Sequence, residues 1–232
     1  MSERLSIETP TGSFSAYVAR PTAARAPGVV VIQEIFGVNA VMREVCDELA
    51  SYGGYLAVCP DMFWRLEPGV DISDRSQGEW DKALDLMNRF DVDLGVEDIR
   101  RTIDRVRADP ACNGKVGAVG YCLGGRLAYL TATRADSDAS VGYYGVGVET
   151  YLAEAERLAQ PLMLHVAEED AFVPKAAQQR IVSALKDHPQ VTLHTYPGRD
   201  HAFARPGGDH FHQADAGLAN DRTVDFLKAH LG

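Results

Sequence analysis

The sequence predicts an α/β fold in which helices lie on both faces of a mainly parallel sheet of seven or eight strands. Short apolar runs alternate along the chain with stretches whose apolar residues recur every three or four positions. Strands separated by helices imply right-handed crossovers, and such crossovers produce parallel sheets with both faces covered. The length of 232 residues fits one domain of this class, residues 1–232.

The first half of the chain begins with a hairpin and continues as strand, helix and strand. Thr11-Gly12 is the expected hairpin turn. Asn39 is expected to cap a helix at 41–49 and Gly53-Gly54 to end it, because asparagine accepts hydrogen bonds from free helical N–H groups and glycine stops a helix. The four expected strands are residues 5–7, 14–18, 29–33 and 55–59.

Residues 60–78 interrupt this alternation. They include Met62 and Trp64 but show no clear periodicity. A long irregular loop beside an α/β core more often forms the wall of a site than a plain connection. We therefore expect residues 60–90, which comprise this loop and a helix at 79–90, to form part of the wall of a site.

The alternation of strand and helix resumes in the second half of the chain. Ligands of open parallel sheets bind beyond the C-terminal ends of the strands. Six loops are therefore expected to carry chemistry, those after Gln33, Cys59, Val119, Tyr144, Val166 and Tyr196. The expected strands here are residues 115–119, 140–144, 162–166 and 191–196, and the expected helices are residues 96–107, 123–133, 151–158, 174–186 and 214–230.

The composition excludes several classes of protein. A formal net charge of −10 disfavours a nucleic-acid binder that neutralises phosphates, and it requires any anion site to be a local cluster of Arg or Lys. The first residues carry charge where a signal peptide needs an apolar core, and the apolar run Val29–Ile32 is too short to span a membrane. None of the four cysteines forms a C-x-x-C pair. We expect a cytoplasmic protein without a metal, a cofactor, or a nucleic-acid or membrane partner.

Residues 120–125 read Gly-Tyr-Cys-Leu-Gly-Gly and join an expected strand to an expected helix. This pattern matches the nucleophile elbow G-x-S-x-G, with cysteine in the place of serine. So tight a turn requires glycines on both sides and exposes Cys122 at its tip. The N–H of Leu123 in the first helical turn can face an oxyanion, and the helix N-terminus favours a thiolate. A tight turn around a buried cysteine is the structural alternative.

Two further strand-end loops carry Asp170 and His201. The chain order of nucleophile, acid and base is that of the α/β-hydrolases, in which histidine accepts the proton of the nucleophile and the acid fixes the histidine tautomer. Taken singly, Asp170 could cap a helix and His201 could be a surface loop residue. Three other acidic residues are alternatives to Asp170, because spacing alone does not exclude them: Glu168, Glu169 and Asp200.

The loop after Gln33 offers Glu34 and Ile35. In the same fold a backbone N–H of this loop is the second oxyanion donor, and Ile35 is the natural candidate. Glu34 follows an apolar strand, where an unpaired carboxylate is costly. A salt bridge between Glu34 and a nearby arginine is the structural alternative.

These stretches are similar to the dienelactone hydrolase (carboxymethylenebutenolidase) family, a cysteine branch of the α/β-hydrolases. The resemblance extends over nearly the whole chain. The motifs that carry it are Gln33–Asn39, Gly114–Gly117 with Gly120–Gly125, Val141–Gly147, Asp170–Pro174 and His201–Arg205.

The resemblance implies an α/β-hydrolase that opens an unsaturated lactone through an acyl-enzyme. It implies Cys122 as the nucleophile, His201 as the base and Asp170 as the residue that orients the base. Glu34 then interacts with the resting thiol and helps to generate the thiolate when substrate displaces it. The two oxyanion amides are those of Ile35 and Leu123.

The resemblance also implies substrate-binding residues, with one departure from the family pattern. Arg205 matches an arginine that holds the substrate carboxylate, and Tyr144 and Phe36 belong to the same pocket. Trp80 stands where a second such arginine is expected, and Arg75 could replace it. Loss of one charged hydrogen bond, worth roughly 1.5–3 kcal/mol, would weaken the binding of an anionic lactone. Trp80 could instead favour an apolar or aromatic acyl group.

The function predicted from the sequence is hydrolysis of a dienelactone-like lactone by a monomeric enzyme of aromatic compound degradation. A general carboxylesterase or thioesterase with the same three residues is the enzymatic alternative. A non-catalytic thiol redox sensor is the alternative from another class, since a thiol in an electropositive elbow also suits oxidation. Asp170, His201 and two candidate oxyanion amides favour catalysis, because a sensor needs none of them.

Overall fold

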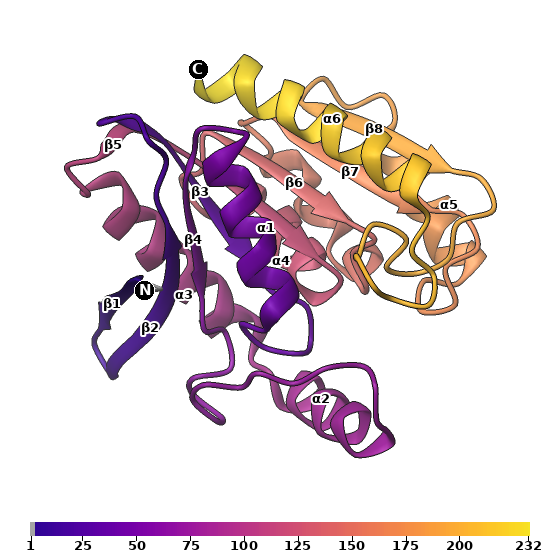
Figure 1. The fold of residues 1–232 in the computed structure, drawn as a ribbon. Helices are drawn as coiled ribbons and strands as arrows, with labels where there is room; N and C mark the ends of the chain where they lie inside the picture. The colour runs from indigo at the N-terminus through magenta and orange to yellow at the C-terminus, as the bar shows by residue number, and fades with distance from the viewer. Residues whose placement is uncertain (1–2) are drawn as a thin grey trace. The chain divides into compact units, whose positions relative to one another are not determined.

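The computed structural model describes residues 3–232, which form an α/β fold with eight strands. The strands follow the order β1-β2-β4-β3-β5-β6-β7-β8, and the mainly parallel sheet confirms the predicted fold class (Figure 1). The chain divides into two compact units, of which the first ends at Ala118 and the second begins at Val119. Each unit is described by itself below. The expectation that residues 1–232 form one domain stays a prediction. None of the helices in residues 3–232 is both long and apolar enough to cross a lipid bilayer.

The elements alternate along the chain much as the hydrophobic pattern predicts. The strands are β1 (Glu3–Thr9), β2 (Gly12–Ala19), β3 (Ala26–Ile32), β4 (Leu56–Pro60), β5 (Cys112–Tyr121), β6 (Ala139–Tyr143), β7 (Leu162–Ala167) and β8 (Val191–Tyr196). The helices are α1 (Ala40–Ser51), α2 (Gln77–Arg89), α3 (Val92–Arg107), α4 (Leu123–Arg134), α5 (Lys175–Leu185) and α6 (Gln213–Leu231), with short 3-10 helices η1 (Val148–Thr150) and η2 (Leu152–Arg157).

The first unit contains the hairpin and the two strands that follow it. β1 and β2 pair antiparallel, β2 pairs antiparallel with β4, and β4 pairs parallel with β3. Both α1 and α3 pack on these strands. The side chain of Asn39 accepts a hydrogen bond from the backbone N–H of Met42 at 3.2 Å, so α1 begins at the predicted cap.

The irregular segment between β4 and α2 is held in place by buried polar side chains. The carboxylate of Asp61 accepts hydrogen bonds from the N–H groups of Phe63 and Gly69, at 3.1 and 2.7 Å. The segment also pairs with the loop after β3, because the N–H of Val38 donates to the carbonyl of Val70 at 3.1 Å. A Cβ atom at Gly37 would lie 1.9 Å from that carbonyl oxygen, so this close approach requires glycine.

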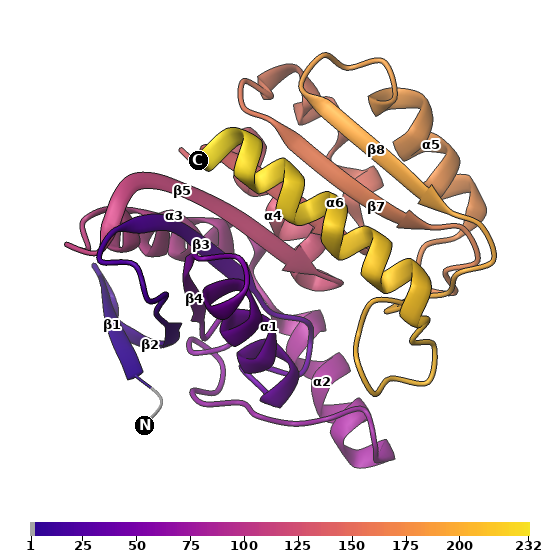
Figure 2. The same ribbon diagram turned by 45° about the horizontal axis from the view of Figure 1, so that its top comes forward.

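The second unit contains three parallel strands, β6, β7 and β8. Successive side chains of a strand point to opposite faces, so two neighbours on β6 show which helix covers each face. The Tyr143 hydroxyl donates to the Ala219 carbonyl of α6 at 3.1 Å. A Cβ atom at Gly142 would lie 2.8 Å from the Gly125 carbonyl of α4. Therefore α6 and α4 cover opposite faces, and α6 runs beside β7 in both ribbon views (Figures 1 and 2).

One expected helix takes a different form. The pattern predicts a helix at 151–158, but η2 in this segment is a 3-10 helix. The N–H of Leu158 donates to the carbonyl of Ala155, three residues earlier. Pro161 follows closely, and proline disfavours helical backbone in the residue before it. A segment this short forms the tighter 3-10 turns instead of an α-helix.

A buried hydrogen-bond network attaches α6 to the strands of the second unit. The ring of His165 on β7 lies between two hydroxyls, with Nδ1 2.7 Å from Tyr196 Oη and Nε2 3.0 Å from Thr223 Oγ1. Thr223 Oγ1 also lies 2.6 Å from the Tyr143 hydroxyl. Burial, together with the nearby positive charge of Arg222, holds the pKa of His165 well below its ordinary value. The network therefore contains a neutral imidazole.

We expect Thr223→Val to lower the free energy of unfolding by about 1–3 kcal/mol, because it removes the hydroxyl that joins Tyr143 and His165 and leaves buried polar atoms unpaired. Thr192→Val, at an exposed position of β8, is the control and should change stability by at most about 0.5 kcal/mol. Urea unfolding followed by circular dichroism measures both. Equal effects of the two substitutions would contradict the role of the network.

Candidate active site

The turn between β5 and α4 places Cys122 at the N-cap of α4. Its N–H donates to the Tyr143 carbonyl at 3.1 Å, and its carbonyl accepts from the N–H of Gly125 at 3.0 Å. A Cβ atom at Gly120 would lie 1.9 Å from the Gly124 carbonyl oxygen, so no other residue fits there without a backbone shift. The structure thus contains the strand–turn–helix that the Gly-x-Cys-x-Gly pattern predicts.

Residues with unfavourable backbone angles lie in the loops at the ends of the strands around this turn. In residues 3–232, three residues other than glycine have a positive φ: Cys122 at 56°, Tyr144 at 37° and Ala202 at 60°. Each is fixed by a hydrogen bond; for example, the N–H of Tyr144 donates to the His165 carbonyl at 2.8 Å. Such strain persists only where the surroundings enforce it, and it is common at functional sites.

Asp170 and His201 come from different loops and meet in the interior. Nδ1 of His201 lies 2.9 Å from Oδ2 of Asp170, and both residues are buried. The other oxygen of Asp170 accepts hydrogen bonds from the N–H groups of Phe172 and Val173, at 2.8 and 3.2 Å. These bonds fix the carboxylate, so it can hold the imidazole in one orientation and one tautomer.

The other acidic residues of these loops have different partners. Oδ1 of Asp200 accepts hydrogen bonds from the N–H groups of Ala171 and His201, at 3.0 and 2.6 Å. Although burial opposes it, these donors lower the pKa of Asp200. Asp200 therefore ties the two loops together through the backbone, while Glu169 pairs with Lys175 at the surface. Among the acidic candidates of the sequence, Asp170 is the one that contacts the imidazole nitrogen.

The charge of His201 is governed by its two neighbours. Burial alone would lower the pKa of the imidazole. The Cys122 sulfur and the Asp170 carboxylate, which both form hydrogen bonds with the ring and attract its positive charge, raise the pKa of His201 to about 10. The two neighbours therefore favour the positively charged form of the His201 ring.

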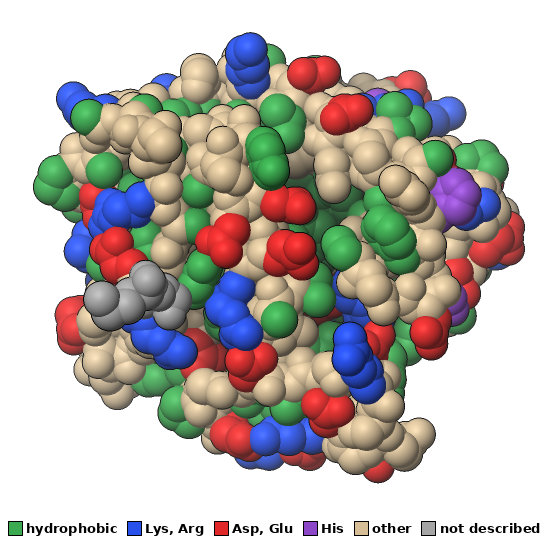
Figure 3. Space-filling model, viewed as in Figure 1, with side chains coloured by type: hydrophobic (Ala, Val, Ile, Leu, Met, Phe, Trp, Pro, Cys, Tyr) green, Lys and Arg blue, Asp and Glu red, His purple; other side chains and the backbone are tan. Residues whose placement is uncertain are grey.

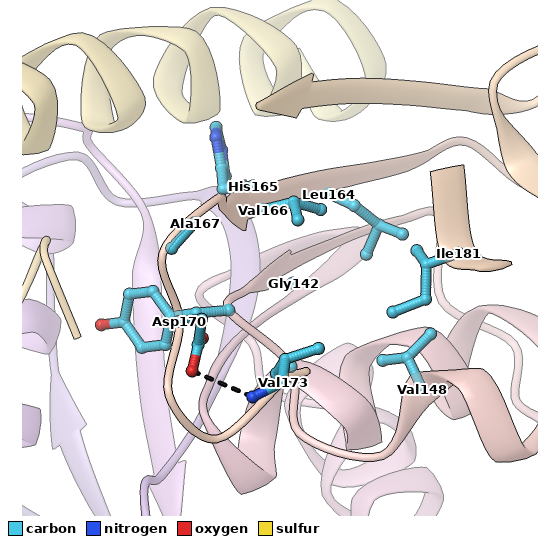
Figure 4. Close-up of a pocket in the computed structure, with 11 residues that line it drawn as sticks. Gly142, Val148, Leu164, His165, Val166, Ala167, Asp170, Val173 and Ile181 are labelled. Carbon is cyan, nitrogen blue, oxygen red and sulfur yellow. Dashed lines mark hydrogen bonds between the residues drawn. The ribbon is translucent and has the colours of Figure 1, made fainter. Parts of the chain in front are cut away.

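A small apolar pocket lies behind the Asp170 carboxylate. In Figure 4, the side chains of Val148, Leu164 and Ile181 point into one end of it. At the other end, Asp170 accepts the hydrogen bond from the N–H of Val173. The apolar lining keeps this side of the carboxylate away from water, which strengthens its interaction with the imidazole.

The model of the dienelactone hydrolase family matches residues 14–231. The chain belongs to the dienelactone hydrolase family.

A protein of Azospirillum brasilense named "Putative carboxymethylenebutenolidase" is 53% identical over 225 residues, which cover 95% of each chain. The carboxymethylenebutenolidase of Pseudomonas putida is 41% identical over 228 residues, which cover 98% of this chain and 96% of that protein. A crystal structure named "Putative Dienelactone Hydrolase", from Klebsiella pneumoniae, has a TM-score of 0.84 at 25% identity and covers 98% of both chains. These findings make the chain a hydrolase that acts on ester or lactone bonds.

Several of the residues that the family resemblance singles out lie together in the second unit. The Tyr144 ring packs edge-on against the His201 imidazole, with ring centroids 5.1 Å apart. Leu123 is the first residue of α4, where backbone N–H groups lack partners within the helix. Arg205 is half-buried in the loop after β8, and its N–H donates to the Ala202 carbonyl.

The other family candidates lie in the first unit and are described within it. Glu34, Ile35 and Phe36 are buried at the end of β3. The Phe36 ring packs edge-on against the Trp80 indole, with centroids 5.1 Å apart, and the indole N–H donates to the Asp74 carbonyl at 2.9 Å. The loop after β3 and the segment 60–90 thus contact one another, and the expectation that residues 60–90 form part of the wall of a site stays a prediction. The roles of these residues, and of the exposed Arg75, stay predictions.

Two side chains near the candidate site in this family member have no role in the sequence-based hypothesis. Phe172 places its ring 4.8 Å from the His201 ring, between centroids, and is 47% exposed. Arg126 lies one helical turn after Cys122 and is partly buried. Phe172 lies within the motif Asp170–Pro174, and Arg126 directly follows the motif Gly120–Gly125, but neither motif assigns these two side chains a role.

We expect the His201 imidazole to titrate near pH 10 in the native protein and at a lower pH in Cys122→Ala, because the variant loses the attraction and hydrogen bond of the sulfur. NMR titration of the imidazole measures both values. Since the folded-state pKa exceeds the ordinary 6.5, the stability contributed by this pair is complete below pH 6.5 and is lost as the pH rises through about 10. Identical titration curves for the two proteins would contradict the effect of the sulfur on the pKa of the imidazole.

Proposed function

We propose that this chain opens an unsaturated lactone through an acyl-enzyme on Cys122, with His201 as the proton carrier and Asp170 as the residue that orients it. The observation that carries this proposal is the position of the buried His201 ring. Its Nδ1 lies at hydrogen-bond distance, 2.9 Å, from Oδ2 of Asp170, and the ring also forms a hydrogen bond with the Cys122 side chain. Relatives named carboxymethylenebutenolidase over nearly the full chain support the lactone as the substrate.

The first half of the proposed reaction forms a thioester. The Cys122 thiolate attacks the carbonyl carbon of the lactone, a C–S bond forms, and the carbonyl oxygen becomes an oxyanion that accepts a hydrogen bond from the Leu123 N–H. When the oxyanion collapses, the ring C–O bond breaks. The ring oxygen leaves with the bonding electrons, takes the proton of the His201 imidazolium, and stays tethered to the acyl group, which leaves His201 neutral.

The second half of the reaction hydrolyses the thioester. Neutral His201 accepts a proton from water as the water oxygen attacks the thioester carbonyl. Collapse of this second tetrahedral intermediate breaks the C–S bond and restores the thiolate beside the imidazolium. The product is the ring-opened carboxylic acid, which ionises. Asp170 stays ionised throughout and supports the positive charge on the ring.

The remaining assignments concern substrate binding and the second oxyanion donor. We assign the binding of the substrate carboxylate to Arg205 and place Tyr144 at the wall of the pocket, where its ring already packs against His201. Following the family resemblance, the second oxyanion N–H is that of Ile35, and Glu34 assists formation of the thiolate. Phe36 and Trp80 contact the acyl group.

We expect Cys122→Ala to lower kcat for an unsaturated lactone at least about a thousandfold, because no other group in the proposed mechanism can form the acyl-enzyme. Cys112→Ala, which removes a buried sulfur at the start of β5, is the control and should retain activity. Intact mass spectrometry of the quenched native enzyme should show an acyl adduct on Cys122. Full activity of Cys122→Ala would exclude this cysteine as the nucleophile. Sulfenic acid or mixed disulfides without ester turnover would instead indicate a redox sensor.

We expect Arg205→Ala to raise KM for a carboxylate-bearing lactone by about tenfold or more and to leave KM for a neutral aryl ester nearly unchanged, because it removes one charged hydrogen bond. Arg180→Ala, at an exposed position of α5, changes the net charge equally and serves as the control. Steady-state kinetics with both substrates provide the comparison. Equal effects on both substrates would remove the carboxylate-binding role, and a higher kcat/KM for neutral esters than for lactones would favour a general esterase.

A further inference from the structure

The chain after His201 folds back on itself and brings His210 beside the proposed base. The N–H of His212 donates to the Phe203 carbonyl at 2.9 Å, which closes the segment between them. The side chain of His212 then caps α6 by accepting a hydrogen bond from the N–H of Asp215. The start of α6 therefore fixes the position of this segment, and His210 lies within it, close to the backbone of His201.

The ring of His210 donates a hydrogen bond to the backbone of His201. Nδ1 of His210 lies 3.2 Å from the carbonyl oxygen of His201 and 3.6 Å from Oδ2 of Asp200. A carbonyl and a carboxylate accept hydrogen bonds and do not donate them, so Nδ1 of His210 must carry the hydrogen. An imidazole can carry it there in the neutral form as well as in the charged form. The bond to the carbonyl therefore does not require a charged ring.

Side chains hold both backbone polar groups of His201. Oδ1 of Asp200 accepts from its N–H at 2.6 Å, and Nδ1 of His210 donates to its carbonyl. Asp200 also accepts from the N–H of Ala171, the residue after the proposed acid Asp170. The peptide groups on the two sides of the His201 Cα atom are thus attached to neighbouring segments, and together they determine the direction in which the imidazole leaves the backbone.

This attachment matters because the next residue is strained. Ala202 has a φ of 60°, which residues with a side chain rarely adopt. Strain of this kind relaxes unless the surroundings oppose it. The carbonyl of His201 belongs to the peptide group that precedes this angle, so relaxation of the angle would turn the carbonyl. The bond from His210 opposes that rotation on one side of the angle, and on the other side the Ala202 carbonyl accepts from the N–H of Arg205 at 2.9 Å.

The two contacts of His210 differ in weight. The side chains of His210 and Asp200 are 48% and 33% exposed, and acidic and basic side chains are interspersed over the face drawn in Figure 3. Exposed ion pairs contribute little, because water and salt screen the charges. The other contact ends on a backbone atom of His201, which is a buried residue. The hydrogen bond, and not the charge of His210, is therefore the contact that can affect the base.

We propose that His210 is a positioning residue for the base: by holding the carbonyl of His201, it keeps the imidazole in contact with the Asp170 carboxylate. This inference rests on the proposed function, because it takes His201 as the proton carrier. Misplacing a reacting group by about 1 Å can lower a rate about a hundredfold. A bond that only fixes the backbone of His201 therefore affects the rate of each step in which the imidazole moves a proton.

Two substitutions of His210 place a hydrogen-bond donor at different distances from the backbone. The amide nitrogen of asparagine and Nδ1 of histidine are both attached to Cγ, so His210→Asn keeps a donor near the position of Nδ1. The amide nitrogen of glutamine is attached to Cδ, so His210→Gln keeps the same kind of donor but displaces it. Both variants lack the ring and its charge. Comparing them separates the hydrogen bond to His201 from the other properties of the imidazole.

We expect His210→Ala and His210→Gln to lower kcat for an unsaturated lactone by about fivefold to tenfold, the effect of losing one hydrogen bond. KM should stay nearly unchanged, because His201 acts in the chemical steps. His210→Asn should retain most of the native kcat. His230→Ala, which removes another exposed histidine, from α6, is the control and should behave like the native protein.

The position of the His201 ring can be measured without substrate. The proton between Nδ1 of His201 and Oδ2 of Asp170 is expected to give a downfield line in the proton NMR spectrum, which its loss in His201→Ala identifies. This line should shift or broaden in His210→Ala and His210→Gln and stay in place in His210→Asn. Urea unfolding of the same proteins shows whether they are equally folded.

A native NMR line in His210→Ala would overturn the proposal, and so would a native kcat in His210→Ala where His201→Ala is inactive. Equal losses in His210→Asn and His210→Gln would overturn it as well. If His210→Ala does not fold, the comparison of His210→Asn with His210→Gln decides. Failure of the proposed function is recognised separately: His201→Ala would then retain lactone hydrolysis, and the NMR line alone would decide whether His210 positions the ring.

Discussion

The proposed chemistry depends on one buried contact, between Nδ1 of His201 and the Asp170 carboxylate. The contact is made possible by two loops that reach the same place from β7 and β8, and Asp200 joins these loops by accepting hydrogen bonds from the backbone of both. Burial alone would keep the imidazole neutral, because burial lowers its pKa. The Cys122 sulfur and the fixed Asp170 carboxylate both raise this pKa, so together they let the imidazole carry a positive charge.

The backbone around this contact is held in conformations that isolated residues avoid. Cys122, Tyr144 and Ala202 all have positive φ angles. Hydrogen bonds between neighbouring strand ends hold Cys122 and Tyr144, and a bond within its own loop holds Ala202. A parallel sheet is suited to this purpose, because its strand ends are adjacent and each can hold the next. The network around His165 attaches α6 to the opposite face of the strands from α4. The strain is therefore supported by a rigid set of strands and not by the loops alone.

Much of the fold and part of the candidate site could be predicted from the sequence because local patterns determine them. The Asn39 cap, the close packing of Gly120 on Gly124 and the alternation of strands and helices follow from rules that act over a few residues. Spacing alone could not separate Asp170 from Asp200, because each lies in a loop that follows a strand and only three-dimensional placement separates a side chain that bonds the imidazole from one that bonds the backbone. The choice of Asp170 came from the family resemblance. The predicted helix at 151–158 failed because periodicity does not register how little chain remains before Pro161.

Arg126 could not be found from the sequence for a related reason. Arg126 and Arg134 are both arginines of α4, and their spacing says nothing of what each contacts. In the structure Glu154 satisfies Arg134, whereas Gly147 rests on Arg126 and supplies no acceptor for its Nε. The two arginines therefore differ in what the loops around α4 bring to them, and this information lies in segments far from the helix in the sequence, where helical spacing cannot show it.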